Sequence, residues 1–432
     1  MKQKIVLAIA ACALAVSCAS GGKLNGGPDF TKIYPQPQME LSPSYFQLGG
    51  FYAAYPDVEI APTKAPEGYE PFFITHYGRH GSRSQSAKGI YLGLISPLRE
   101  ADERSNLTED GKEILRRAEA LYAIQADSLG ALLPRGYDEH RHIMDRICSH
   151  YPEIFSQGGS VRSFSTKTPR VVASMKTANS VLASRFPSLK ISMDNSSEVQ
   201  SMYFSREELV RSRERHSKQI NDYSDAMDFS RLMSSIFNDP SLADSSSFPK
   251  IASSLWILSA EALLVKRPDL ELFKFMTYDE AYALWSHRCK GVGMALGPSE
   301  QEYKAVRGDV RKVVSHMLAT SREAIESDDA PRAVFHFGHD TQLVPIVHLL
   351  GIKGFSTSYD STDQVISRWR DYLVSPMGGN VQMILFRKSG SDDVLVKFLV
   401  LENEVALDGL STDCWPFYHW SAVEPFLESR MQ

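Results

Sequence analysis

The apolar and polar positions of this chain alternate between short strand-like runs and longer helical repeats. Residues 71–75 are aromatic and β-branched, and further strand-like runs begin at Val161 and Val334. Each run leads through a polar loop into a helical pattern. This repetition of strand, loop and helix predicts an α/β fold with a central, mostly parallel sheet flanked by helices.

A long helical region interrupts the alternation. Its helical segments cover 206–238, 248–265 and 278–289. We therefore expect an all-α domain at 205–301, inserted into an α/β core formed by 44–204 and 302–432. Strand-like runs at 381–386 and 394–401 then return the chain to the sheet. A length of 432 residues exceeds one ordinary core, which agrees with this division.

The first strand-to-loop junction concentrates glycine and positive charge. Gly78 and Gly81 permit a tight loop that approaches a ligand closely. In the same segment, Arg79 and Arg83 bracket His80. Guanidinium groups bind phosphate or carboxylate oxygens through fixed forks, and imidazole can attack phosphorus. The pattern indicates an anion pocket with a nucleophile inside it; the alternative is a histidine packed under a loop with two solvated arginines.

The second junction places an arginine at a helix start. Thr168 suits the N-cap and Pro169 the first helical position, so Arg170 projects from the N-terminus of a helix. Free backbone N–H groups and the helix dipole favour an anion there. Taken alone, an ordinary salt bridge would be the simpler role for Arg170.

The third junction ends in a histidine and an aspartate. Gly338 follows the strand, and His339 and Asp340 lead into a helical pattern. A histidine there can donate to a phosphate oxygen, and a partly protonated aspartic acid can give a proton to a departing alkoxide. In open α/β sheets, ligands bind at the edge where such strands end.

Together these segments resemble the histidine acid phosphatases, a branch of the histidine phosphatase superfamily. The branch includes phytases, glucose-1-phosphatases and multiple inositol polyphosphate phosphatases. Its motif Arg-His-Gly-x-Arg-x-Pro is similar to the run from Arg79 to Arg83, which keeps both arginines, His80 and Gly81. Gln85 replaces the final proline, so we expect a less rigid loop without the loss of a catalytic atom.

The other two junctions resemble the same family. Arg170 matches its third phosphate-binding arginine, which also opens a helix. His339 and Asp340 are similar to its distal His-Asp pair, where many inositol polyphosphate phosphatases carry His-Ala-Glu. The pair favours the acid phosphatase and phytase-like side of the family. The resemblance runs from about residue 40 to the end of the chain, and it implies that the helical domain is a cap over the active site.

The resemblance implies a two-step displacement that needs no metal or cofactor. His80 attacks the phosphorus in line while Asp340 protonates the leaving oxygen. Water then attacks the phosphohistidine, with Asp340 accepting a proton, and phosphate leaves. Phosphate binding falls to four residues: Arg79, Arg83, Arg170 and His339.

The N-terminus has the features of a bacterial export signal. Two lysines precede an apolar stretch at 5–16, which is too short to span a bilayer as a helix. Residues 1–18 are therefore interpreted as a lipoprotein-type signal peptide. Residues 19–43, rich in Gly, Pro, Asn and Gln, are interpreted as a flexible linker. We expect an exported protein that is either periplasmic or anchored to the outer membrane.

Lipidation is expected at Cys18, because residues 15–18 approximate a lipobox. A second lipobox ending at Cys12 has a better sequence but leaves a very short apolar core. Plain cleavage after Ala19 is the alternative, and it would give a soluble periplasmic protein.

Export permits disulfides, but the body of the chain holds only Cys148, Cys289 and Cys414. Three cysteines allow at most one intramolecular bond, whose pairing cannot be read from the sequence. No Cys-x-x-Cys motif occurs and glycines interrupt the histidine pairs, so no metal site is expected. His140 and His142 lie in a charged stretch and are expected to be solvated.

Composition and charge fit a folded enzyme with a local anion site. With 43% hydrophobic and 23% charged residues, the chain has the balance of a globular protein. A formal net charge of −5 argues against a general polyanion-binding surface such as one for nucleic acid. We therefore expect the positive charge to be concentrated in the pocket.

These observations predict hydrolysis of phosphomonoesters, with phytate, sugar phosphates and nucleotides all open as substrates. Two alternatives use the same pocket: a lipoprotein that binds a phosphate ligand without turnover, and a mutase-like enzyme that transfers a phosphoryl group between sugars. Export away from cytosolic phosphoglycerate argues against the second. The expected partners are a small-molecule substrate and a membrane, the latter through the N-terminal lipid only; the sequence does not reveal the oligomeric state.

Overall fold

The computed structural model describes residues 45–56, 61–203, 227–297, 300–356 and 369–432, with a few single positions between these ranges. The predicted signal peptide at 1–18, Cys18 and the predicted linker at 19–43 lie outside the described residues.

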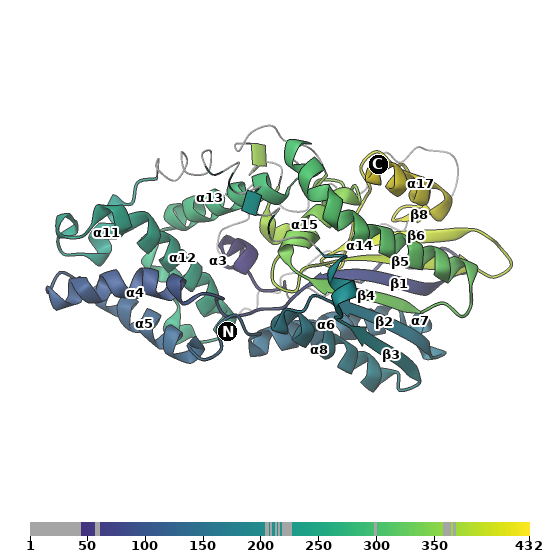
Figure 1. Cartoon of the computed structure of the whole chain (residues 1–432), viewed down its shortest axis with the longest axis horizontal. Coiled ribbons are helices and arrows are strands. Elements are labelled where there is room, and N and C mark those ends of the chain that lie inside the picture. The colour runs from purple at the N-terminus through teal and green to yellow at the C-terminus, as the bar shows by residue number, and fades with distance from the viewer. Residues whose placement is uncertain are drawn as a thin grey trace, which may run out of the picture.

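An eight-stranded sheet forms the centre of the described structure (Figure 1). One half consists, in spatial order, of β3 (Leu189–Asp194), β2 (Gly159–Ser165), β4 (Ala333–Gly338) and β1 (Tyr69–Arg79). The other half continues with β5 (Asn380–Lys388), β6 (Val394–Val400) and β7 (Asn403–Glu404), and β8 (Phe417–His419) pairs with β6.

The sheet is mixed rather than mostly parallel. β3, β2, β4 and β1 pair in parallel, whereas β5 to β8 form antiparallel pairs. The connection between β5 and β6 covers only 389–393, and so short a connection can join neighbouring strands only when they are antiparallel. The predicted α/β class is confirmed, and the parallel half carries all three predicted junctions.

Helices cover both faces of the sheet (Figure 1). One face carries α14 (Glu300–Glu326), α15 (Asp340–Leu349) and α17 (Trp420–Met431). The other carries α6 (Pro134–His150), α7 (Pro152–Ser156) and α8 (Pro169–Arg185). Every residue of β4 and β6 is accordingly buried, which explains their continuous apolar character.

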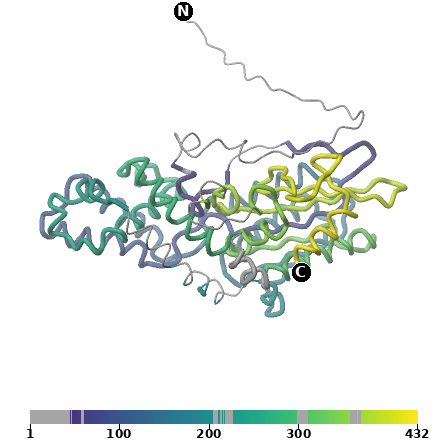
Figure 2. The backbone as a smooth tube through the Cα atoms, turned by 90° about the horizontal axis from the view of Figure 1, so that it is seen from above, coloured from purple at the N-terminus to yellow at the C-terminus, as the bar shows by residue number. Residues whose placement is uncertain are grey.

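A helical lobe extends from one end of this layered domain, on the left of Figure 1 and again in the view of Figure 2. It contains α11 (Ser230–Ile236), α12 (Phe248–Val265) and α13 (Tyr278–Leu296), which fall within the predicted insertion at 205–301. It also contains α4 (Lys88–Glu103) and α5 (Glu109–Gln125), since α4 packs on α12 and α5 on α11. The predicted core segment 44–204 thus contributes two helices to the lobe, because their apolar faces find partners there and not on the sheet.

The core helix of the lobe is α12. The stretch 245–265 is long and apolar enough to cross a membrane, with a mean hydropathy of 1.4, but 61% of it is buried inside the protein. The indole N–H of Trp256 donates to the carbonyl oxygen of Leu48 at 2.9 Å. This bond holds α3 (Tyr45–Leu48) and the following η1 (Gly50–Tyr52) against the lobe.

Candidate active site

The three predicted junctions meet at one edge of the sheet. Arg79 at the end of β1 pairs with Gly338 of β4, and Ser165 at the end of β2 pairs with Phe337. Because parallel strands point the same way, the residues that follow them gather at this edge. Six predicted site residues interact electrostatically here: Arg79, His80, Arg83, Arg170, His339 and Asp340.

Backbone hydrogen bonds fix the loop that carries His80. The N–H of Arg79 donates to Gly379 O at 2.7 Å, and the N–H of His80 donates to Gly338 O at 3.0 Å. The carbonyl oxygen of His80 accepts from the N–H of Gly378 at 2.9 Å. The loop is therefore tied both to β4 and to the segment that enters β5.

Close packing explains the glycines of this loop. A Cβ atom on Gly81 would lie 2.5 Å from the carbonyl oxygen of Gly136 in α6, and one on Gly136 would lie 2.3 Å from Ser82 O. At Gly78 the obstacle would be the ring of His76, also at 2.5 Å. Neither Gly78 nor Gly81 has a positive φ, so these contacts, and not a left-handed backbone, exclude a side chain.

Arg79 is almost completely buried, with 2% of its side chain exposed. Its Nη1 donates to Phe51 O and to Ser375 O, both at 2.7 Å. Its Nη2 lies 3.7 Å from Oδ2 of Asp340. Burial lowers the pKa of Arg79, and Asp340 opposes that shift. Nη1 is thus held by carbonyl groups, Nη2 lies near Asp340, and Nε has no acceptor among the described residues.

The imidazole of His80 is placed to act through Nε2. Its Nδ1 lies 2.9 Å from the carbonyl oxygen of Gly81. Because a carbonyl oxygen only accepts hydrogen bonds, Nδ1 must carry the proton, which leaves Nε2 of the neutral ring with its lone pair. Burial, followed by the charges of Arg79 and Arg170, keeps the pKa of His80 well below 6.5. His80 is therefore an unprotonated nucleophile even in mildly acidic solution.

Arg83 and Arg170 complete the positive cluster. Arg83 Nη1 donates to Ser84 O at 2.8 Å, and Arg170 follows Pro169, which occupies the predicted first position of α8. Burial, followed by repulsion from Arg83 and Arg79, lowers the pKa of Arg170 to about 10. Within the described part of the chain, the Nε–H groups of all three arginines are buried without an acceptor. Convergent donors of this kind favour an anionic ligand.

His339 and Asp340 lie at the start of α15. The N–H of His339 donates to Gln342 Oε1 at 3.0 Å, and Asp340 is the first helical residue. Burial, followed by the charge of Arg170, lowers the pKa of His339 to about 4, so its ring is neutral above that pH. The side chain of Asp340 is 26% exposed. Asp340 therefore borders both the arginine cluster and solvent.

Three buried carboxyl groups near the site were not predicted. Glu139 of α6 accepts from the N–H and the hydroxyl of Ser82, both at 2.6 Å. Glu261 of α12 accepts from the hydroxyl of Tyr91 at 2.6 Å, and burial raises its pKa to about 7. Asp371 is likewise buried, with a pKa raised to about 6. None of the three belongs to a local motif, so no sequence signal marks them.

The structure also describes the histidine, cysteine and metal-site expectations outside the active site, and the burial of His140 differs from the prediction. His140 is buried, with its ring centroid 5.9 Å from that of Phe337, because α6 turns this residue toward β4. In the described part of the chain, Cys148, Cys289 and Cys414 form no disulfide. Among the described residues, no group of three or more His, Cys, Asp or Glu side chains could hold a metal ion.

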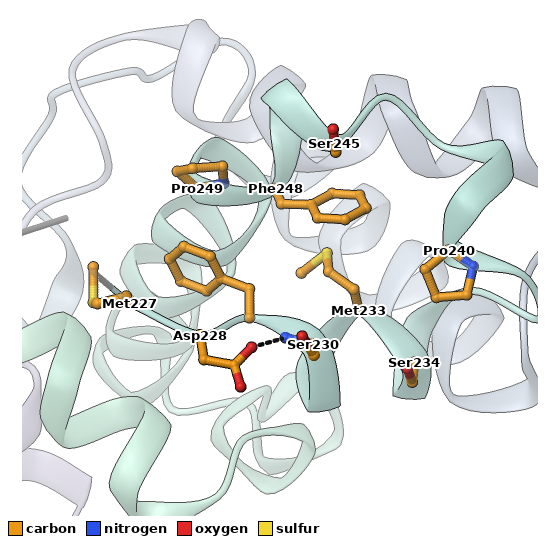
Figure 3. A pocket seen from close by; sticks show the side chains of 10 residues that line it. Met227, Asp228, Ser230, Met233, Ser234, Pro240, Ser245, Phe248 and Pro249 are labelled. Carbon is orange, nitrogen blue, oxygen red and sulfur yellow. Dashed lines mark hydrogen bonds between the residues drawn. The ribbon is translucent and has the colours of Figure 1, made fainter. Parts of the chain in front are cut away.

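A separate cavity of about 460 Å³ lies in the helical lobe (Figure 3). It is formed by α11, the start of α12 and the turns between them. Asp228 at its rim accepts from the N–H of Ser230 at 2.8 Å. None of the residues lining this cavity is a predicted site residue, so it is distinct from the cluster around His80.

Comparison by sequence finds no relative: no protein-family model matches the chain, and no curated protein matches it. Comparison by structure finds similar proteins. The multiple inositol polyphosphate phosphatase of Bifidobacterium longum, in complex with phosphate, is similar over 89% of this chain and 98% of its own, with a TM-score of 0.74 and 18% identity.

Two phytases are also similar in structure. The phytase of D. castellii is covered over 90% of its length and covers 94% of this chain, with a TM-score of 0.65 and 12% identity. The Hafnia alvei phytase in complex with myo-inositol hexakis sulphate is similar over 98% of its own length and 85% of this chain, with a TM-score of 0.52 and 11% identity. The chain thus has the histidine phosphatase fold with its α-helical cap, and the resemblance to histidine acid phosphatases is confirmed at the level of the fold.

Proposed function

We propose that this protein is a phosphatase of the histidine acid phosphatase kind, which hydrolyses phosphomonoesters through a phosphohistidine intermediate. The observation that carries the proposal is the neutral His80, whose Nε2 is free to attack among three arginines with unsatisfied Nε–H groups. A buried donor without an acceptor costs about 1–3 kcal/mol. A phosphoryl group would satisfy several such donors and place its phosphorus beside the nucleophile.

The first chemical step transfers the phosphoryl group to the enzyme. The lone pair of His80 Nε2 forms a bond to phosphorus, and the bond from phosphorus to the ester oxygen breaks. Asp340, protonated at this stage, gives its proton to that oxygen, which leaves as an alcohol. Arg79, Arg83 and Arg170, with His339, stabilise the charge that develops on the other phosphoryl oxygens.

The second step regenerates the enzyme. A water molecule attacks the phosphohistidine and gives a proton to the carboxylate of Asp340. The N–P bond breaks, its electron pair returns to His80 Nε2, and inorganic phosphate leaves. The side chain of Asp340 lies beside the arginine cluster and is still partly exposed to solvent, so both the leaving oxygen and the attacking water can reach it.

Inositol phosphates are the substrates that we propose first, with sugar phosphates as the next class. One finding supports this order: solved structures that share the fold include an inositol polyphosphate phosphatase and phytases. The arginine cluster also recognises the phosphoryl group itself and makes no demand on the alcohol, so simpler phosphomonoesters should react as well.

We also propose that the protein is exported and anchored by a lipid at Cys18. Support comes from the apolar stretch at 5–16 and the adjoining lipobox-like residues. Metabolic labelling with a radioactive fatty acid tests the anchor. Label is expected in the wild type and not in Cys18→Ser, whereas equal labelling of both would contradict lipidation at this residue.

The function is tested by measuring phosphate release from phytate, glucose 1-phosphate, AMP and p-nitrophenyl phosphate between pH 3 and 8, with and without EDTA. We expect release that EDTA does not reduce. Quenching in strong alkali, in which phosphohistidine is stable, in the presence of ³²P-labelled substrate should trap label on the wild type and none on His80→Ala. Binding of phosphate without release from any of the four substrates would favour a ligand-binding protein instead.

A further inference from the structure

Asp371 is a fully buried carboxylate that gathers hydrogen bonds from three parts of the fold. It is the first residue of η6 (Asp371–Leu373). Its Oδ2 accepts from the N–H of Phe51 at 3.0 Å. Its Oδ1 accepts from the indole N–H of Trp285 and from the N–H of Tyr372, both at 2.9 Å. Asp371 thus joins η1, α13 of the helical lobe and the segment that precedes β5.

Both carbonyl groups that hold Arg79 lie in segments fixed by Asp371. Phe51 donates its N–H to the carboxylate and accepts from Arg79 Nη1 through its carbonyl oxygen. Ser375 also bonds to both residues, but through the backbone of Asp371. Its N–H donates to the carbonyl oxygen of Asp371 at 2.8 Å, and its own carbonyl oxygen accepts from Arg79. The position of the guanidinium therefore depends on two backbone segments that meet at one residue.

The space around this carboxylate is filled. Gly50 has a φ of +55°, and a Cβ atom there would lie 2.5 Å from Asp371 Oδ2 and 2.9 Å from Cδ1 of Trp285. A side chain at position 50 would be strained both by its backbone conformation and by these contacts. The frame around Asp371 thus has little freedom to shift without displacing Phe51.

Hydrogen-bond donors and cations surround the buried carboxyl group of Asp371. Burial raises its pKa to about 6, and the hydrogen bonds from Trp285 and Phe51 oppose that shift. Three other titratable groups interact with it: Arg79, Arg288 and the thiol of Cys289. An isolated buried carboxylate is costly, so the donors and cations around Asp371 offset its desolvation.

We propose that Asp371 is the positioning residue for Arg79: its carboxylate fixes Phe51 and its backbone carbonyl group fixes Ser375, so that Nη1 is held by the carbonyl groups of these two residues and Nε and Nη2 remain for the phosphoryl group. This inference rests on the proposed function only for the identity of the anion. In this proposal, a residue of η6 that is anchored to the helical lobe through Trp285 sets the position of an arginine at the end of β1.

The main test is Asp371→Asn, which keeps the size of the side chain but turns one acceptor oxygen into an NH₂ group facing N–H donors. Inorganic phosphate binding is measured by calorimetry, and KM and kcat with p-nitrophenyl phosphate. We expect Kd for phosphate and KM each to rise at least about tenfold, with a smaller fall in kcat. Lys397→Met is the control, because it removes a buried charge on β6 that Thr63 and Glu404 hold away from the site.

A second variant keeps the inference testable if Asp371→Asn does not fold. Trp285→Phe keeps an aromatic ring but removes the indole N–H together with part of the buried ring volume, so phosphate affinity should fall by about twofold to fivefold. Unchanged phosphate affinity in a folded Asp371→Asn, or in Trp285→Phe, would overturn the inference. A loss of thermal stability like that of Lys397→Met without a change in KM would do the same.

The two proposals fail in different ways. A wild type that binds phosphate but hydrolyses nothing contradicts the proposed function, and the phosphate affinities of the two variants still test the role of Asp371. A wild type that neither binds phosphate nor releases it contradicts both.

Discussion

The rings of His80 and His339 lie edge to face, with their centroids 5.5 Å apart. One histidine follows β1 and the other follows β4, two neighbouring parallel strands. Burial and the nearby arginines keep both rings neutral in mildly acidic solution, since both pKa values are lowered. One ring can therefore attack phosphorus while the other, protonated at a single nitrogen, donates to a phosphoryl oxygen.

Removal of the nucleophile should abolish turnover but not binding. His80→Ala is expected to reduce kcat by at least about 10³-fold, because it removes the imidazole that attacks phosphorus. The arginines remain, so calorimetric Kd for inorganic phosphate should stay within a few fold of the wild type. Release of phosphate at more than one tenth of the wild-type rate would contradict the role of His80.

Loss of the acid should depend on the leaving group. With Asp340→Asn, hydrolysis of an alkyl phosphate is expected to slow about 10²–10³-fold, because the alkoxide then leaves without a proton. p-Nitrophenolate needs little protonation, so its release should slow less than about tenfold. Steady-state kcat for the two substrates checks this, and equal losses would remove Asp340 from the acid role.

The pH profile should retain activity well below pH 6.5. Protonation of His80 blocks attack, but its pKa is held well below 6.5 and that of His339 is about 4. The acid limb of kcat/KM is therefore expected near or below pH 4, and activity should decline toward pH 8 because the first step needs a protonated acid. An acid limb near pH 6.5, or a steady rise to pH 8, would contradict these protonation states.

Replacement of a buried histidine should stabilise the fold in acid. His140 has a pKa of about 4 in the fold, below the ordinary value of 6.5, and Nε2 has no partner among the described residues. The unfolded chain therefore binds the proton first, so stability is lost as pH falls from 6.5 to 4, by up to about 1.4 kcal/mol per pH unit.

His140→Phe removes this dependence. Urea titrations at several pH values should therefore show that the free energy of unfolding of the variant rises relative to that of the wild type as the pH falls from 6.5 to 4. The raised pKa values of Glu261 and Asp371 act with the opposite sign. Both groups are present in wild type and variant alike, so the difference isolates His140. A difference that stays constant over this range would show that His140 is already protonated in the fold.

Introducing at position 85 the proline of the histidine acid phosphatase motif should destabilise this protein. Gln85 is buried, its carbonyl oxygen accepts from Gly130, and its N–H interacts with the carboxyl of Glu261 and the hydroxyl of Tyr91. Gln85→Pro removes that N–H beside a buried carboxyl, which should cost about 1–3 kcal/mol in chemical denaturation. Gln85→Ala keeps the N–H and serves as the control; a proline variant as stable as the alanine variant would contradict the role of the N–H.

The sequence was sufficient for the parts of the site that lie at strand ends. Arg79, Arg170 and His339 each follow a strand-like run, and parallel pairing necessarily brings those ends to one edge. Local chemistry, namely a helix start at Pro169 and a glycine at the end of β4, marked the positions. Short-range patterns therefore predicted which side chains would meet.

Partners that are distant in the chain escaped prediction. Asp371 obtains its donors from Phe51 and Trp285, and no short-range pattern connects these three residues. The apolar faces of α4 and α5 are equally compatible with a sheet or a helix as partner, so their place in the lobe depended on tertiary packing. For the same reason His140, on a charged helix, could not be recognised as facing β4.

The contact between Gly81 and Gly136 restricts two positions that are distant in the sequence to glycine. Neither can accept a methyl group unless the loop and α6 separate, and that separation would move His80 relative to the arginines. Evolutionary drift and laboratory libraries are thus confined at both positions at once, even though Gly136 belongs to no catalytic motif. Redesign for a new leaving group should leave this pair untouched and diversify the lobe that faces the site.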